Sequence, residues 1–101
     1  MGFNTELLHG TKTGDPVTGA TLTPVYQSSA FFQPSAEQHE KLFHNKAAGY
    51  SYTRISNPTI AAFEERMTVL EKGAASVACA SGMAAITNAL LNIVGSGDEI
   101  I

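Results

Sequence analysis

The chain has 101 residues, of which 44% are hydrophobic and 15% charged, a composition typical of a globular rather than a disordered protein. Its formal net charge is -3 and only six lysines and arginines are spread along it, which argues against binding to nucleic acid or to an anionic membrane. Residues 1–8 include Asn4, Thr5 and Glu6 where a signal peptide would need apolar residues, so we expect a cytoplasmic protein.

The first 34 residues are rich in glycine and proline, which predicts an irregular arm with short extended pieces such as residues 25–32. The same segment carries large apolar side chains: Leu7, Leu8, Leu22, Val25, Phe31 and Phe32. Because an arm left free in water would expose these side chains, we expect it to dock on a partner subunit or on another domain. A flexible leader is the alternative interpretation.

A first helix is predicted directly after the arm. Ser35 and Gln38 have the spacing of a capping box, which favours a helix from about Ala36 to Lys46 that ends near Gly49. The residues that follow, 50–56, are rich in Tyr, Thr and Ile and predict an extended segment.

A second helix is predicted after this extended segment. Asn57 can cap its start, Pro58 suits its first turn, and Lys72 with Gly73 closes it. Apolar side chains fall on one stripe at helical spacing, and we expect this stripe to pack in the core: Ile60, Phe63, Met67 and Leu70.

The last third of the chain predicts a strand, a helix and the start of another strand. Residues 74–80, AASVACA, are apolar and flanked by turn residues, as expected of a strand buried on both faces. A helix from about Gly82 to Val94 follows, and residues 99–101 resemble the first residues of a second strand. This order is the unit of a parallel sheet, which needs more strands, so we expect the chain to be a fragment.

The cysteine and histidine content predicts neither a disulfide nor a metal site. Cys79 is the single cysteine and lies in the apolar run, which favours a buried, unreactive thiol. His9, His39 and His44 have no cysteine or second histidine at a spacing that metal ions favour, and we assign no metal.

Ser81, Gly82 and Met83 lie at the step from the predicted strand to the predicted helix. The first N–H groups of a helix are unpaired and carry partial positive charge, so a phosphate fits there. Gly82 allows an anion to approach the backbone closely, Met83 offers a second N–H, and Ser81 adds a hydroxyl or acts as the cap. A simple helix cap without a ligand is the alternative.

Tyr52 and Arg54 are two residues apart in the predicted extended segment, so their side chains should point to the same face. Arginine offers a planar fork of donors to phosphate or carboxylate oxygens, and a tyrosine hydroxyl adds another donor. The pair therefore suits an anion, although an exposed arginine stacked on a tyrosine ring is the alternative interpretation.

Five blocks of sequence together resemble the Cys/Met-metabolism family of pyridoxal-phosphate enzymes. They are PVYQSSAF (24–31), GYSYTRISNPT (49–59), LEKG (70–73), ACASGMAAI (78–86) and GDEI (97–100). The resemblance implies an α/β fold, the amino-terminal part of an aminotransferase-like fold-type-I enzyme. It divides the chain into an arm and interface segment (1–57) and the start of the mixed-sheet domain that binds pyridoxal 5'-phosphate (58–101).

The resemblance also implies roles for the two candidate sites. In the family, the tyrosine and arginine that match Tyr52 and Arg54 reach the cofactor phosphate of the neighbouring subunit. The residues that match Gly82 and Met83 bind the phosphate of their own subunit through backbone N–H groups, with Ser81 beside them. The expected assembly is a homotetramer built as a dimer of dimers, in which the arm lies across the partner subunit.

The family's lysine that holds the cofactor, its pyridine-nitrogen aspartate and its ring-stacking tyrosine match no residue of this chain. Four lysines, Lys12, Lys41, Lys46 and Lys72, stand in other contexts. We therefore expect no catalytic residue in the chain and no activity from these 101 residues alone.

The interval from His39 to Arg54 is most similar to the O-acetylhomoserine sulfhydrylase branch of the family. The implied reaction replaces the acetate of O-acetyl-L-homoserine by sulfide or a thiol and gives homocysteine or methionine. A cystathionine γ-synthase or a γ-lyase would share the same residues. A non-catalytic interface fragment and an unrelated anion-binding α/β domain are alternatives of other classes.

Overall fold

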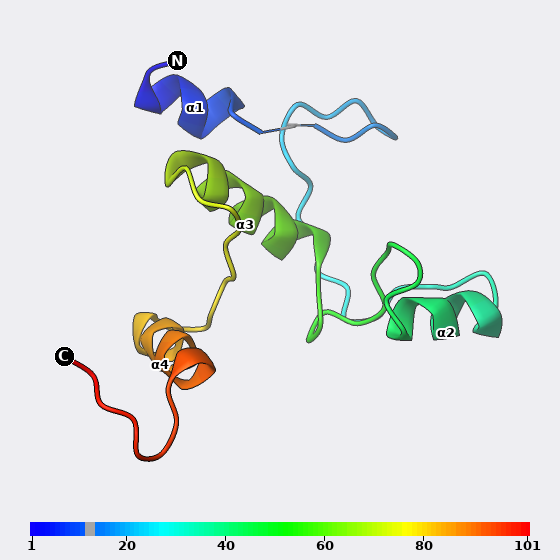
Figure 1. Cartoon of the computed structure of the whole chain (residues 1–101). Helices are drawn as coiled ribbons and strands as arrows, with labels where there is room; N and C mark the ends of the chain where they lie inside the picture. Colours follow the sequence, from blue (N-terminus) through cyan, green and yellow to red (C-terminus); the bar gives the residue numbers. More distant parts are fainter. Residues whose placement is uncertain (12–13) are drawn as a thin grey trace.

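A computed structural model describes residues 1–11 and 14–101 of the chain; Lys12 of the arm lies outside these ranges. Four helices occur in the described part: α1 (Phe3–His9), α2 (Ala36–Phe43), α3 (Pro58–Leu70) and α4 (Gly82–Ile93). Figure 1 shows α1 beside α3, with α2 and α4 apart from them on different sides. The radius of gyration is 17.0 Å, whereas a compact domain of this length has about 13 Å. The arrangement is therefore open.

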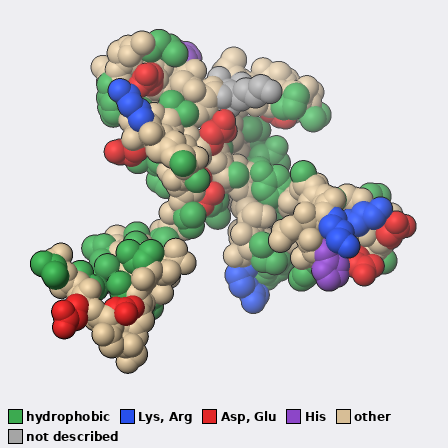
Figure 2. Space-filling view, in the orientation of Figure 1, with side chains coloured by type: hydrophobic (Ala, Val, Ile, Leu, Met, Phe, Trp, Pro, Cys, Tyr) green, Lys and Arg blue, Asp and Glu red, His purple; other side chains and the backbone are tan. Residues whose placement is uncertain are grey.

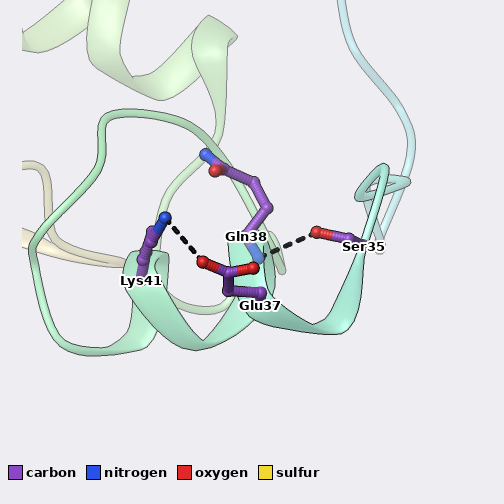
Figure 3. Close-up of polar contacts among 4 residues, drawn as sticks. All are labelled: Ser35, Glu37, Gln38 and Lys41. Carbon is purple, nitrogen blue, oxygen red and sulfur yellow. Dashed lines mark hydrogen bonds and ion pairs between the residues drawn. The ribbon is translucent and has the colours of Figure 1, made fainter.

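Helix α2 begins at the predicted residue. The Ser35 hydroxyl oxygen accepts a hydrogen bond from the Gln38 N–H at 3.1 Å, and Lys41 forms an ion pair with Glu37 one turn away at 3.0 Å (Figure 3). The predicted end at Lys46 is wrong by three residues, because Asn45 has a left-handed φ of 55°. The Lys46 N–H then donates back to the Lys41 carbonyl at 2.8 Å, a bond that closes the helix.

Helix α3 confirms the predicted start. The Asn57 side chain accepts a hydrogen bond from the Thr59 N–H at 2.8 Å, and Pro58 is the first helical residue. The helix ends at Leu70, where Lys72 takes the left-handed conformation with a φ of 52°. The Gly73 N–H donates to the Thr68 carbonyl at 2.9 Å, so Gly73 closes the turn although the left-handed residue is Lys72.

The arm is not irregular throughout, because residues Phe3–His9 form helix α1 beside α3. The Arg66 guanidinium on α3 donates a hydrogen bond to the Leu7 carbonyl. This carbonyl belongs to the last turn of α1, where carbonyls lack helical partners and a positive charge is favourable. The prediction of an irregular arm relied on the glycines and prolines of the segment, whereas α1 also has a contact with a residue 59 positions away along the chain.

A turn in the arm is held by Asp15. Its carboxylate accepts hydrogen bonds from the Thr18 hydroxyl at 2.7 Å and from the Val17 N–H at 3.1 Å. These bonds favour the charged form, so they lower the pKa of this exposed carboxyl below its ordinary value. The turn therefore keeps this contribution at neutral pH and loses it only as the pH falls through the lowered pKa.

A second part of the arm lies against its own chain. Ala30 and Tyr52 form an antiparallel bridge, in which the Phe31 N–H donates to the Ser51 carbonyl at 3.0 Å and the Thr53 N–H to the Ser29 carbonyl at 2.8 Å. This part of the arm is thus held by its own chain, and docking of the arm on a partner subunit or on another domain stays a prediction.

The segment predicted to be extended over 50–56 is extended only as far as the Ala30–Tyr52 bridge. Ile55 and Ser56 both donate their N–H groups to the Tyr52 carbonyl, at 3.0 and 3.1 Å, so residues 52–56 form a turn. The prediction from residue type was wrong here because the hydrogen bonds of the turn are local and compete with an extended backbone.

Helix α4 confirms the predicted helix after the apolar run, but the run itself is not a strand. Residues 74–80 have no partner strand among the described residues, and neither do residues 99–101. A buried parallel strand requires neighbours on both sides, which the described residues do not supply. Val77 is accordingly 82% exposed.

Cys79 is partly exposed, so its predicted burial is wrong in this chain. The apolar run that should have enclosed the thiol has no strand beside it. The Asn88 side-chain amide of α4 donates a hydrogen bond to the Cys79 sulfur at 3.6 Å.

The prediction that the apolar stripe of α3 packs in a core is also wrong, because the described residues supply no surface to cover it. Phe63 is 56% exposed, and no hydrophobic side chain of the described residues is buried. Figure 2 shows hydrophobic side chains at the surface around α4 and the end of the chain.

In the part that the structure describes, no helix is both long and apolar enough to cross a membrane.

The absence of buried apolar side chains in residues 1–11 and 14–101 predicts how the 101-residue chain behaves when it is produced alone. Hydrophobic burial is the main favourable contribution to cooperative folding, so heating should reduce the helical circular dichroism gradually. The intact protein serves as the control and should melt in a steep transition. A steep, reversible transition of the isolated chain would contradict this account.

Candidate functional site

Ser81 begins helix α4 as its N-cap. Its hydroxyl oxygen accepts a hydrogen bond from the Ala84 N–H at 3.0 Å, and its carbonyl accepts one from the Ala85 N–H at 3.0 Å. The cap interpretation is thus correct for the hydroxyl oxygen. The hydroxyl hydrogen is still free to be donated, because an accepting hydroxyl keeps its own O–H donor.

Gly82 and Met83 present the first N–H groups of α4. Neither N–H donates to an acceptor within the described part of the chain. A side-chain carbon built on Gly82 would have no atom within 4 Å, and Met83 is 69% exposed. Two unpaired donors at the positive end of a helix, with open space above a glycine, fit a phosphate group.

Tyr52 and Arg54 lie close together, although not for the predicted reason. They belong to the turn over residues 52–56 rather than to an extended strand, and the guanidinium carbon of Arg54 lies 5.1 Å from the centre of the Tyr52 ring. This is cation–π stacking, the alternative that the sequence left open. Both residues are exposed, and their side-chain donors bond to no other described residue. The stacked pair therefore keeps its N–H and O–H donors available for an anion.

The structure does not bring the two groups into one site. In Figure 1 the turn that follows the bridge at Tyr52 lies between α3 and α2, whereas α4 lies apart from it, below the other end of α3. Ser81, Gly82 and Met83 thus form one candidate anion-binding surface, and Tyr52 with Arg54 forms another. Within the described ranges there is no cluster of His, Cys, Asp and Glu able to hold a metal ion.

One residue next to the site has a role beyond the one that the sequence indicated. Asn57 was predicted only as a helix cap, yet it is buried, with 3% of its surface exposed, and also contacts the arm and the turn. The signal in the sequence is weak, because Asn before Pro is a common helix start.

Comparison with known proteins identifies the class of protein that these surfaces belong to. Residues 4–101 match the family described as Cys/Met metabolism PLP-dependent enzyme. The chain therefore belongs to this family of pyridoxal 5'-phosphate enzymes, and the predicted cofactor is confirmed.

Several characterised relatives are similar over almost the whole chain. The O-acetyl-L-homoserine sulfhydrylase of Corynebacterium glutamicum is 44% identical over 99% of this chain, which covers 23% of that enzyme. The L-methionine gamma-lyase of Pseudomonas deceptionensis is 43% identical and the cystathionine gamma-lyase of Bacillus subtilis 45% identical, with 25% and 24% of those enzymes covered. The chain thus spans about a quarter of the length of these relatives.

Two solved structures have the same fold over 97% of this chain. One is a putative O-acetylhomoserine (thiol)-lyase of Campylobacter jejuni, 35% identical with a TM-score of 0.85, whose cofactor is attached to a lysine. The other is the cystathionine gamma-lyase of Lactobacillus plantarum, 40% identical with a TM-score of 0.78. The chain covers 23% of each. The predicted fold class, the amino-terminal part of a fold-type-I α/β enzyme, is confirmed.

The open space above Gly82 predicts the effect of a single added methyl group. Gly82→Ala should weaken the binding of pyridoxal 5'-phosphate to the intact apoprotein by about tenfold, because the methyl group occupies the place of the anion. The stability of the apoprotein should stay constant or rise by up to about 1 kcal/mol, since alanine favours a helix over glycine.

The matched control for this substitution is Gly2→Ala, which also places a methyl group in open space but lies at the start of α1. Equilibrium titration with the cofactor and with pyridoxal, which lacks the phosphate, measures the effect. Unchanged cofactor affinity in Gly82→Ala would contradict the assignment of this surface.

Proposed function

We propose that the intact protein is an O-acetylhomoserine sulfhydrylase. The proposal is supported by the 44% identity to the Corynebacterium glutamicum enzyme and by the spacing between His39 and Arg54. The enzyme would replace the acetate of O-acetyl-L-homoserine by sulfide or a thiol, and give homocysteine or methionine. Methionine biosynthesis in the cytoplasm is the corresponding cellular role.

A γ-lyase is the second candidate and has similar support from the comparisons. The methionine and cystathionine gamma-lyases are 43% and 45% identical to this chain. A lyase would cleave the bond between the γ-carbon and sulfur and release a thiol, whereas the sulfhydrylase would form that bond. A cystathionine γ-synthase would use the same phosphate-binding residues.

The roles that we propose for the five site residues are those implied by the family resemblance, and the geometry of the residues supports them. The Gly82 and Met83 N–H groups, with the Ser81 hydroxyl, would hold the cofactor phosphate of their own subunit. Tyr52 and Arg54 would donate to the phosphate of the neighbouring subunit. The observation that carries this proposal is the separation of the two surfaces within one chain, since a phosphate held by both must contact two chains (Figure 1). When bound, the cofactor supplies a conjugated ring that accepts electrons released at the substrate carbons.

The expected assembly is a homotetramer of two dimers, with each site shared across a dimer. Of the three described lysines, Lys41 pairs with Glu37 through its side chain, whereas Lys46 and Lys72 contribute only backbone groups to the ends of α2 and α3. None of them matches the family's lysine that holds the cofactor, so we propose that the 101 residues alone are inactive.

Assays of the intact protein separate the two candidate reactions. A sulfhydrylase should consume O-acetyl-L-homoserine in the presence of sulfide and form homocysteine at a much higher kcat/KM than it releases a thiol from L-methionine or L-cystathionine. If thiol release from either amino acid is faster, the lyase is the correct function. The phosphate-binding roles hold in either case.

The trans arrangement predicts complementation between two inactive variants of the intact protein. Arg54→Ala should lower cofactor affinity and activity, because a charge-assisted contact worth roughly 1.5–3 kcal/mol is lost. A second variant would lack only the lysine that holds the cofactor. In a heterodimer of the two, one site has the lysine of the first chain and Arg54 of the second, so activity should return to nearly half of the wild-type value. Heterodimers that form but stay inactive would show that Arg54 serves its own subunit.

A further inference from the structure

The side chain of Asn57 uses three of the four hydrogen-bonding positions of its amide within the described structure. Its oxygen accepts from the Thr59 N–H at 2.8 Å, which is the helix cap. Its NH₂ group donates to the Tyr26 carbonyl and to the Thr53 hydroxyl oxygen, each at 3.0 Å. A cap alone needs only the first bond. The other two connect the arm to the turn that carries Tyr52 and Arg54.

Thr53 is held from two directions. Its hydroxyl accepts from Asn57 and donates to the Ser28 carbonyl at 2.5 Å, while its N–H donates to the Ser29 carbonyl at 2.8 Å. Thr53 lies between Tyr52 and Arg54 in the chain, so these bonds fix the backbone from which both side chains project.

Thr59 completes the connection on the other side of Asn57. Its hydroxyl accepts from the Tyr26 N–H at 2.9 Å and donates to the Pro24 carbonyl at 3.3 Å. The arm from Pro24 to Ser28 is therefore held by three side chains, those of Thr53, Asn57 and Thr59, and Asn57 is the buried one among them. Hydrogen bonds that are shielded from water define geometry more strongly than exposed ones.

We propose that Asn57 is a positioning residue for the phosphate-binding pair: its buried amide holds the Tyr52–Arg54 turn against the arm, so that the Arg54 guanidinium faces the neighbouring subunit's cofactor phosphate. This rests on the proposed role of Tyr52 and Arg54. Both side chains are exposed and stack only on each other, so their direction depends on the backbone of the turn. A planar guanidinium binds phosphate well only when it is correctly oriented.

Two substitutions separate positioning from helix capping. Asn57→Asp keeps the oxygen that caps α3, since Asp and Asn cap equally well, but places a second oxygen opposite the Tyr26 carbonyl. Thr53→Val keeps the shape of the side chain and removes its hydroxyl, and Thr53→Ser restores the hydroxyl. Thr68→Val is the matched control, because the Thr68 hydroxyl bonds to Glu64 and Ser76 outside this network.

The measurement is the ratio of the dissociation constants of the intact apoprotein for pyridoxal 5'-phosphate and for pyridoxal. Asn57→Asp and Thr53→Val should each weaken binding of the phosphorylated form by roughly five- to tenfold, the range for one lost hydrogen bond. Pyridoxal affinity should not change. Thr53→Ser and Thr68→Val should bind like the wild type. In a background that carries both Tyr52→Phe and Arg54→Ala, Asn57→Asp should cause no further loss, because both donors that it positions are gone.

Two results would overturn the proposal, and they differ in whether the phosphate role of Arg54 stands. If Arg54→Ala changes the ratio while Asn57→Asp and Thr53→Val lower only the melting temperature, Asn57 is structural and the phosphate role of Arg54 stands. If Arg54→Ala leaves the ratio unchanged, the phosphate role fails and the positioning role fails with it. Should Asn57→Asp not fold, the Thr53 variants decide between these outcomes by themselves.

Discussion

The buried amide of Asn57 connects three parts of the molecule that are distant in the sequence or different in structure. It caps α3, holds the arm at Tyr26 and fixes the turn at Thr53. With 3% exposure it is the only buried polar side chain of residues 1–11 and 14–101, where no hydrophobic side chain is buried. In this open chain, therefore, directional hydrogen bonds rather than a hydrophobic core define the local arrangement around the Tyr52–Arg54 turn.

The two proposed phosphate-binding surfaces would hold an anion by different physical means. At the start of α4 the donors are backbone N–H groups, whose direction is set by the helix itself, and Gly82 leaves space for the anion. At the turn the donors are long side chains, and their direction depends on Thr53 and Asn57. The backbone donors of Gly82 and Met83 are oriented as soon as α4 forms. The side chains of Tyr52 and Arg54 are oriented only when the arm holds their turn, which accounts for the hydrogen bonds between the arm and the turn.

The sequence predicted the local features well, because these depend on neighbouring residues. Ser35, Asn57 and Ser81 each begin a helix as expected, and all of them accept the predicted backbone hydrogen bond. The candidate phosphate donors at the start of α4 followed from the same reasoning. Prediction from sequence was wrong at three places. Helix α1 contacts a distant arginine, Arg66, and α2 ends early at the left-handed Asn45. Residues 52–56 form a turn because of local backbone hydrogen bonds.

The predicted core was wrong for a different reason. Val77 and Phe63 have the pattern of buried residues, but burial requires partner surfaces that the described residues do not supply. Cys79 is partly exposed for the same reason. The second role of Asn57 could not be predicted either, because it depends on where the arm lies in space.

A crystal structure of the intact protein with pyridoxal 5'-phosphate bound would test the central claim most directly. The claim is that one chain contributes to two phosphate sites. The account predicts a phosphate within about 3 Å of the Gly82 and Met83 N–H groups of one subunit and of the Arg54 guanidinium of another. A phosphate that contacts Arg54 and Gly82 of the same subunit, or that contacts no Arg54, would contradict it.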